Sequence, residues 1–93
     1  MLIENRRAIM KFTDKHADSR TVFAEWLEKA EAAQWTDVVE LKNTFNTADY
    51  VNGLIVFNVG GNNYRLLAEV IFKDKIIRIA KVGTHTEYSG WKL

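Results

Sequence analysis

The sequence contains no cysteine and no proline, and only five of its 93 residues are glycine. Without cysteine, disulfide scaffolds, cysteine zinc sites and thiol catalysis are all excluded. A cytoplasmic location fits this composition, because disulfide bonds belong to oxidising compartments. The lack of proline and the scarcity of glycine also argue against a disordered or low-complexity chain.

Signals for membranes and cofactors are lacking as well. No apolar run approaches the roughly 20 residues that a membrane-spanning helix needs. The opening MLIENRRAIMKF has scattered charges and no apolar centre, so neither a signal peptide nor membrane attachment is expected. There is no GxGxxG or P-loop pattern, and the two histidines, His16 and His85, have no partners at metal-ligand spacing. We therefore expect no cofactor and no metal, and a structural role for His16.

The residues that are present suit a small globular protein. A hydrophobic fraction of 47% and an aromatic fraction of 12% are sufficient for a packed core, so residues 1–93 should form one domain. The charge is uneven: residues 1–50 carry seven Lys/Arg and nine Asp/Glu, whereas residues 51–93 carry six and three. A polyanionic partner would meet the basic second half first, although chance also produces asymmetry of this size.

The first half has the periodicity of helices, after a short apolar opening at 1–4 that could form an edge strand. Apolar residues recur every three or four positions from Arg6, and again in a second helix capped by Asp18 or Ser19. Thr36 could cap a third, short helix. The residues that this third helix would bury are Val38, Val39 and Leu41.

After Thr44 the apolar period changes from 3.6 to 2, which indicates strands. Asn52-Gly53 is a strong hairpin signal, and residues 60–62 and Lys73-Asp74 mark two further turns. These turns separate three or four antiparallel strands. With the N-terminal helices packed on one face of this curved sheet, the sequence predicts a two-layer α+β fold.

The last hairpin has a definite register if Phe72 faces Lys75 across a two-residue turn, because paired residue numbers then sum to 147. One face is the more apolar and should receive the helices; it comprises Tyr64, Leu66, Ala68, Val70, Ile77, Ile79 and Lys81. The other face would leave Arg65 open to solvent. Glu69 and Arg78 would be cross-strand partners on it, and a salt bridge is the favoured interpretation of that pair.

The C-terminal stretch KVGTHTEYSGWKL places His85 and Tyr88 after the last strand, near the end of the strand that carries Arg65. Cations together with a proton-transfer group suit reactions at phosphate. RNA supplies its own nucleophile, the 2′-hydroxyl, so its cleavage requires neither a metal nor a thiol. The further cations that could bind RNA are Arg78, Lys81 and Lys92. These residue types alone do not specify RNA cleavage, because polar residues near a terminus are usually just solvated.

Longer stretches of the sequence indicate a function more specifically than these single residue types do. FNVGGNNYRLLAEVIF, followed by KIIRIAKVGTHTEY, resembles the HigB-type mRNA interferases, toxins of type II toxin–antitoxin modules in the RelE superfamily. The resemblance rests on Phe57-Asn58 with Gly61-Asn62, on Tyr64-Arg65-Leu66, and on residues 82–88. The helical region FTDKHADSRTVFAEWLEKAEAAQW and the segment DVVELKNTFNTADYV are similar too, so the resemblance spans nearly the whole chain.

The resemblance implies a RelE-like fold and ribosome-dependent cleavage of mRNA at the ribosomal A site. The 2′-hydroxyl would attack the adjacent phosphate and leave a 2′,3′-cyclic phosphate and a 5′-hydroxyl. The partner would be a HigA-like antitoxin with a helix-turn-helix domain, through which the toxin would meet operator DNA only indirectly.

The resemblance also implies roles for single residues. Arg65 would act on the scissile phosphate, His85 would be the catalytic residue after a Val-Gly corner, and Tyr88 would stack on a base or transfer a proton. Asn62 and Asn63 would touch the RNA backbone.

Two alternatives to a catalytic toxin stay open. Gly60 stands where similar toxins often carry lysine, which favours a non-catalytic module that keeps the toxin fold and binds an antitoxin or RNA. A plain structural domain is the third reading. Trp91 is expected to pack the C-terminal tail onto the fold rather than to bind a base.

Overall fold

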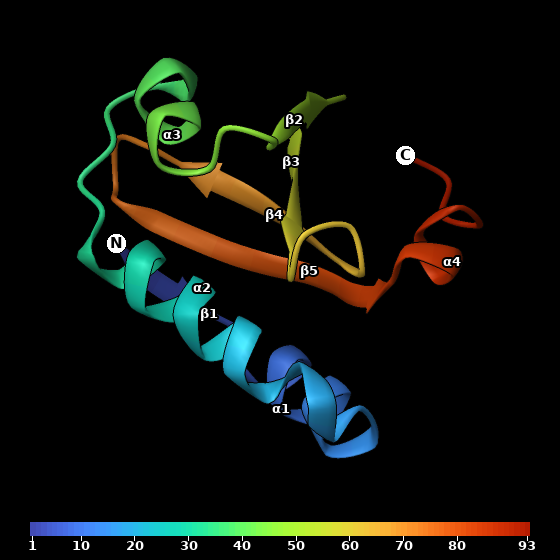
Figure 1. Cartoon of the computed structure of the whole chain (residues 1–93). Coiled ribbons are helices and arrows are strands. Elements are labelled where there is room, and N and C mark those ends of the chain that lie inside the picture. Colours follow the sequence, from blue (N-terminus) through green and yellow to red (C-terminus); the bar gives the residue numbers. More distant parts are fainter.

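The chain folds in the order that its periodicity predicts, with the long helices first and most strands after them. The computed structural model describes residues 1–93. Its elements are β1 (Leu2–Glu4), α1 (Arg7–Lys15), a 3-10 turn (Ala17–Ser19), α2 (Arg20–Ala32), α3 (Val38–Thr44), β2 (Asp49–Val51), β3 (Leu54–Val59), β4 (Tyr64–Ile71), β5 (Ile76–Thr84) and α4 (His85–Tyr88). In Figure 1, α1 and α2 run side by side along the sheet, and α4 follows the far end of β5. None of these helices combines the length and the apolar character that crossing a membrane requires.

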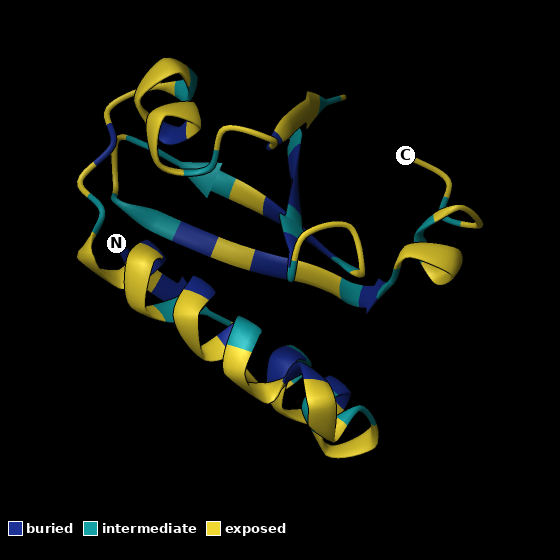
Figure 2. Ribbon diagram, in the orientation of Figure 1, coloured by how far each residue is buried: buried dark blue, intermediate teal, exposed yellow.

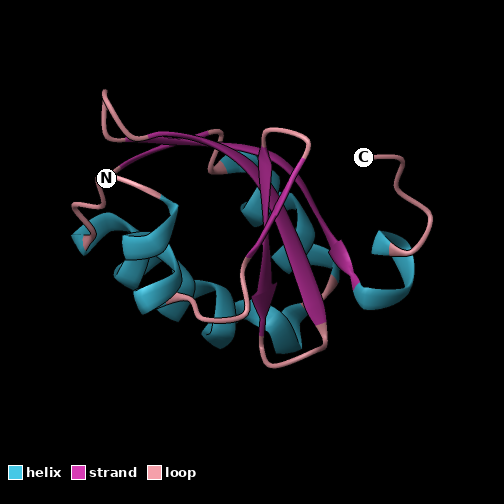
Figure 3. Cartoon of the chain, turned by 90° about the horizontal axis from the view of Figure 1, so that it is seen from above, coloured by secondary structure: helices cyan, strands magenta, loops and turns pink.

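All five strands join one sheet, in the order β1-β5-β4-β3-β2. Strands β2 to β5 pair antiparallel, whereas β1 lies parallel to β5 at the edge. The predicted α+β arrangement is confirmed. The sheet has five strands rather than the predicted three to four, because the N-terminal segment expected as a possible edge strand does join the sheet, as β1. Figure 3 shows how strongly the strands twist, so the sheet is curved as expected.

The first two predicted turns are present. Asn52 and Gly53 have positive φ angles of 50° and 84°, which a two-residue turn between twisted strands requires and which these residue types tolerate. Gly60 and Gly61 also have positive φ angles, 63° and 68°, between β3 and β4. Because glycine adopts such angles without steric cost, this second turn can bend sharply before β4.

The last hairpin keeps the predicted register over four pairs, from Ile71–Ile76 to Ala68–Ile79. Its loop is longer than the predicted two-residue turn at Lys73-Asp74, because Phe72 and Lys75 remain outside the strand pairing. Lys75 has a φ of 58° and donates its backbone N–H to the Phe72 carbonyl oxygen over 3.3 Å. The register is predictable because alternating apolar residues fix which face is buried.

A β-bulge at Ala80 ends the predicted register. Ala80 has no cross-strand partner, so Gly83 rather than Val82 lies opposite Arg65. The prediction that Lys81 lies on the helix-covered face is therefore wrong: Lys81 is exposed, and Val82 packs against the core instead. Strict alternation does not anticipate the extra residue of a bulge, which re-aims every side chain after it.

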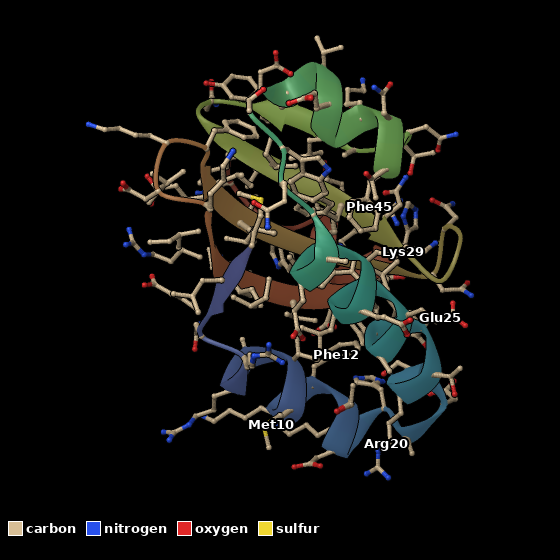
Figure 4. The ribbon with its side chains drawn as sticks, turned by 90° about the vertical axis from the view of Figure 1, so that its left-hand side faces the viewer. Met10, Phe12, Arg20, Glu25, Lys29 and Phe45 are labelled. Carbon is tan, nitrogen blue, oxygen red and sulfur yellow. The ribbon has the colours of Figure 1, made fainter.

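The main core lies between the sheet and the pair α1 and α2, on the face predicted to be the more apolar. Figure 2 shows buried residues alternating with exposed ones along β5, and exposed residues over the outer sides of α1 and α2. Buried residues of this core include Ile9, Phe12, Phe23, Trp26, Ala30, Phe57, Leu66, Ala68, Ile77 and Ile79. Glu25 and Lys29 of α2 are exposed, as predicted for its solvated face, and Figure 4 shows them on the same side of the molecule as Phe45, with which they line a pocket.

Helix α3 differs from the prediction in two respects. Asp37, not Thr36, caps it by accepting the backbone N–H of Glu40 over 2.9 Å. Val39 is 70% exposed although the periodicity predicts its burial, because this short helix buries a single residue, Leu41. Thr36 still contributes, since its backbone N–H and its hydroxyl both donate to the Glu40 carboxylate.

The face of the sheet opposite α1 and α2 is also shielded from solvent, over β3 and β4. Val56 and Leu67 pair across these strands on that face and are 3% and 4% exposed. The C-terminal segment, residues 85–93, lies on this side: Trp91 lies against Gly83 of β5, and the Leu93 carbonyl oxygen accepts a hydrogen bond from the Asn52 side chain over 2.9 Å. The C-terminal segment therefore reaches from β5 to the β2–β3 turn.

Candidate active site

Arg65 is buried, with 6% of its surface exposed, so the prediction of a cation on an open face is wrong. Its guanidinium lies beneath the C-terminal segment, with the Tyr88 ring centroid 5.4 Å from Cζ. None of the ion pairs in the chain involves Arg65. A buried cation without a counter-charge is costly, and an incoming anion would offset that cost. The site is therefore suited to a phosphate group.

Four hydrogen bonds hold the Arg65 guanidinium in place. Nη1 donates to the carbonyl oxygens of Asn62 and Tyr64, over 3.2 and 3.0 Å. Nη2 donates to Oδ1 of Asn62 over 2.5 Å and to Nδ1 of His85 over 2.9 Å. These contacts use all four hydrogens on the Nη atoms, and the remaining guanidinium donor is Nε–H.

The β3–β4 turn supplies most of these acceptors. Because Gly60 and Gly61 bend the chain sharply, both oxygens of Asn62 return to the guanidinium of Arg65. The carbonyl oxygen of Asn63 accepts the backbone N–H of His85 over 2.9 Å. In this structure the two asparagines, predicted as RNA contacts, orient Arg65 and anchor the start of α4.

Helix α4 is a single turn that presents His85 to Arg65. The Thr84 hydroxyl accepts the backbone N–H of Glu87 over 3.1 Å, and the Glu87 carboxylate accepts the backbone N–H of Thr84 over 2.9 Å. This reciprocal capping box fixes where the turn begins. Because a guanidinium only donates, Nδ1 of His85 is the acceptor in its contact with Arg65, which assigns the ring proton to Nε2. His85 is exposed, so a substrate can reach that proton.

Tyr88 completes the cluster from the end of α4. Its half-buried ring lies over the Arg65 guanidinium, and the Trp91 ring meets it edge-on at 5.6 Å between centroids. Tyr64 is adjacent in sequence to Arg65 but packs on the opposite face, against Phe12, and burial raises the pKa of its phenol. Tyr88 is therefore the phenol that accompanies Arg65.

Arg78 lies outside this cluster. Its guanidinium donates to Glu4 over 2.8 Å and to Glu69 over 3.0 Å. The pKa of Arg78 is raised, first by its hydrogen bond to Glu4 and the charge of that carboxylate, and then by Glu69. The predicted salt bridge with Glu69 is confirmed, and β1 adds a second carboxylate. Two other predicted RNA-binding cations belong to the region of the C-terminal segment: Nζ of Lys81 lies 5.6 Å from the Trp91 ring centroid, and Lys92 is exposed.

The sequence-based prediction missed the capping box of α4 and misplaced one corner of the chain. The spacing Thr84-x-x-Glu87 is a recognisable capping-box signal that the prediction did not use. The predicted corner at Val82-Gly83 is wrong, because both residues lie inside β5. The prediction that Trp91 packs the tail down is confirmed by its contact with Gly83.

The chemistry of the cluster is that of a cation, an imidazole and a phenol. No group of three or more His, Cys, Asp or Glu residues is placed to hold a metal ion. His16 is half-buried and stacks on Phe12 with 4.3 Å between ring centroids, in agreement with its predicted structural role. The cluster can therefore bind an anion, donate a hydrogen bond and stack on a planar group without help from the other histidine.

Comparisons with known proteins indicate the family of this chain. A family model described as HigB toxin, a RelE-like toxic component of a toxin–antitoxin system, matches residues 19–91. The chain is 43% identical over 51 residues to the mRNA interferase toxin HigB of Escherichia coli strain K12, and equally to the mRNA interferase HigB of Shigella flexneri. These matches cover 52% of this chain and 49% of each relative, so the chain spans about half the length of the curated relatives it matches. Because the family model covers well over half of the chain and includes the whole Arg65 cluster, this protein belongs to the HigB family of RelE-like toxins.

Proposed function

We propose that this protein is the toxin of a type II toxin–antitoxin system and acts as an endoribonuclease on mRNA, in the cytoplasm, where translated mRNA is found. The observation that carries the proposal is the buried guanidinium of Arg65, which has no carboxylate partner and is bordered by His85 and Tyr88. Such a site attracts a phosphate and places a hydrogen-bond donor next to it. The relatives named mRNA interferase support RNA as the source of that phosphate.

Cleavage would use the RNA's own 2′-hydroxyl as nucleophile. Its oxygen forms a bond to the adjacent phosphorus while the bond from phosphorus to the 5′-oxygen breaks. The 2′-hydroxyl loses its proton and the leaving 5′-oxygen gains one, so the products are a 2′,3′-cyclic phosphate and a 5′-hydroxyl. The charge that grows on the phosphate oxygens in the transition state is what Arg65 would stabilise.

The tautomer of His85 bears on its role. With Nδ1 accepting from Arg65, the imidazole is neutral and the accessible Nε2–H can donate a hydrogen bond. In this form His85 suits a hydrogen bond to a phosphate oxygen. Protonation of the leaving 5′-oxygen would require the imidazolium, with the contact between Nδ1 and Arg65 broken. Tyr88 has both a π-face for stacking on a base and a hydroxyl for proton transfer.

Arg65 would act chiefly through its charge. Both Nη atoms are fully engaged by Asn62, Tyr64 and His85, so a bidentate grip on phosphate would require one of these contacts to break. A fixed cation in a water-poor site still lowers the energy of a nearby anionic transition state, without reorganising during the reaction.

The proposal includes three partners beyond the chain. These are mRNA, the A site of translating ribosomes, and a HigA-like helix-turn-helix antitoxin that neutralises the toxin and connects it to operator DNA. Co-expression with the antitoxin should remove growth inhibition. Growth inhibition that persists at an antitoxin level sufficient for complex formation would count against neutralisation by binding.

The non-catalytic alternative also has an observation in its favour. All four Nη hydrogens of Arg65 bond to groups within the chain. This arrangement is compatible with a structural arginine in a module that only binds antitoxin or RNA. The two readings differ in whether His85 is needed for RNA cleavage.

The deciding experiment adds purified protein to a reconstituted translation reaction and maps the ends of a reporter mRNA. Wild type should produce new 5′-hydroxyl ends. His85→Ala should lower the rate by about 10²- to 10⁴-fold, the usual contribution of a general acid or base. His16→Ala is the matched control, because His16 stacks on Phe12, which packs against Tyr64 on the face of the sheet opposite Arg65. Equal cleavage by wild type and His85→Ala would contradict the catalytic role, and the same RNA without ribosomes tests ribosome dependence.

A further inference from the structure

Gly83 provides the space that the Trp91 indole occupies. Gly83 is buried and is the direct cross-strand partner of Arg65. A Cβ atom built on Gly83 would lie 2.8 Å from Cζ2 of Trp91, closer than real Cβ contacts permit. The lack of a side chain at this position therefore lets the indole lie directly on β5, next to the strand that carries Arg65.

Trp91 also holds Tyr88 from behind. Their rings meet edge-on at 5.6 Å, and the Trp91 backbone N–H donates to the Tyr88 carbonyl oxygen over 2.9 Å. The ammonium of Lys81 lies 5.6 Å from the centroid of the indole. The side chains of Lys81, Trp91 and Tyr88 thus form a continuous row of contacts that ends on the Arg65 guanidinium.

We propose that Trp91 is a positioning residue of the cleavage site, which acts by holding Tyr88 and α4 against Arg65. This inference rests on the proposed ribonuclease function. Four residues of helix cannot maintain their own conformation in water, because helix nucleation is unfavourable and short helices depend on tertiary packing. The indole against Gly83 is the apolar contact that fixes α4 on the sheet, and His85 and Tyr88 share that single turn.

The position of Trp91 predicts its effect on catalysis. Removing the indole should not remove any group that touches the RNA, so KM for the programmed ribosome should stay within about twofold. Loss of alignment between Arg65, His85 and Tyr88 should lower kcat, by about 10- to 100-fold for a displacement on the order of 1 Å.

Four variants test this in the reconstituted translation assay. Trp91→Ala should lower kcat as described, and Trp91→Phe should recover most of it, because a phenyl ring can still fill the space over Gly83. Gly83→Ala should lower kcat by a similar factor, since its Cβ displaces the indole. The Gly83→Ala, Trp91→Ala double variant should be no slower than either single variant, because both changes break the same contact.

A control separates positioning from general stability. Trp35 is buried away from the cluster, and its Nε1 donates to Thr44 over 2.9 Å. Trp35→Phe should lower the melting temperature and leave kcat unchanged at a temperature where the protein is folded. The inference is overturned if Trp91→Ala retains wild-type kcat, or if kcat in all the variants simply follows the folded fraction.

An observation independent of activity separates this inference from the proposed function. In nitrogen-15 NMR spectra, wild type should show slowly exchanging signals from the hydrogen-bonded Nη hydrogens of Arg65, and a His85 ring locked in one tautomer. Both signatures should be lost in Trp91→Ala and retained in Trp35→Phe. If wild type cuts no mRNA, the ribonuclease proposal fails, and the spectra still decide whether Trp91 positions the cluster: unchanged signals in Trp91→Ala overturn it.

Discussion

Nη2 of Arg65 lies 2.9 Å from Nδ1 of His85, so the strand arginine and the helix histidine form one hydrogen-bonded unit. The two residues are 20 positions apart in sequence and come from β4 and α4. The contact assigns the acceptor role to Nδ1 and thereby leaves a donor at Nε2. Changing either residue should therefore disturb the other, and their effects on cleavage should not be additive.

Arg65→Ala should abolish most cleavage and also reduce stability. The substitution leaves a cavity beneath Tyr88 and removes the partners of both Asn62 oxygens, for which we expect a loss of about 1–3 kcal/mol in the free energy of unfolding. Arg65→Met retains much of the volume without the charge and should be equally inactive but more stable than Arg65→Ala. Urea unfolding measures the difference. Wild-type stability in Arg65→Ala would indicate a solvent-exposed arginine, as the simple register predicts.

Arg78→Gln should cleave mRNA at the wild-type rate. Arg78 is paired with Glu4 and Glu69, and its side chain is 51% exposed, so the pairs contribute at most about 1 kcal/mol. Reporter cleavage and a melting curve together check both statements. A cleavage rate that falls while the melting temperature holds would show that Arg78 contacts the RNA after all, as the sequence-level hypothesis states.

Much of the sheet could be predicted because short stretches of sequence specify its turns and its strand register. Asn52-Gly53 specifies a hairpin through the φ angles that these residues tolerate, and alternating apolar residues fix the register from Ile71–Ile76 to Ala68–Ile79. The helices follow from the same kind of pattern at a different period. The three-residue strand β1 carries little of this signal, which explains why the predicted sheet has fewer strands than the observed one.

The sequence predicts which residues form the candidate site, but it does not predict the burial of Arg65 or the residue that lies opposite it in the sheet. Arg65, His85 and Tyr88 are brought together as expected, yet a bulge at Ala80 places Gly83 opposite Arg65, and no alternation rule shows this. The burial of Arg65 depends on a C-terminal segment that folds back over the sheet. Such a contact joins distant parts of the sequence, so it appears only when the tertiary structure is known.

Stability at low pH should depend in part on Glu40. Hydrogen bonds from the hydroxyl and then the backbone N–H of Thr36 lower the pKa of Glu40 below its ordinary value of 4.5. A lowered pKa stabilises the fold above the pKa of the unfolded chain, and the contribution is lost as pH falls through the folded value. In Glu40→Gln the melting temperature should therefore fall less steeply below pH 4.5 than in wild type. An unchanged slope in thermal melts from pH 6 to pH 2 would mean that the Thr36 contacts do not form in solution.

Leu66 and Leu67 test whether the sheet is covered on both faces. They are neighbours on β4 that point to opposite sides, and both are at least 96% buried, with exposures of 0% and 4%. Leu66→Ala should cost about 2–5 kcal/mol, as a truncation in the main core. Leu67→Ala should cost a comparable amount only if the C-terminal segment covers its face, because an exposed leucine contributes little. Val39→Ala, at a 70% exposed position, is the control and should change the free energy of unfolding by less than about 0.5 kcal/mol. A large loss for Leu66→Ala with none for Leu67→Ala would show that the C-terminal segment does not rest on the sheet, and the positions assigned to His85, Tyr88 and Trp91 would fall with it.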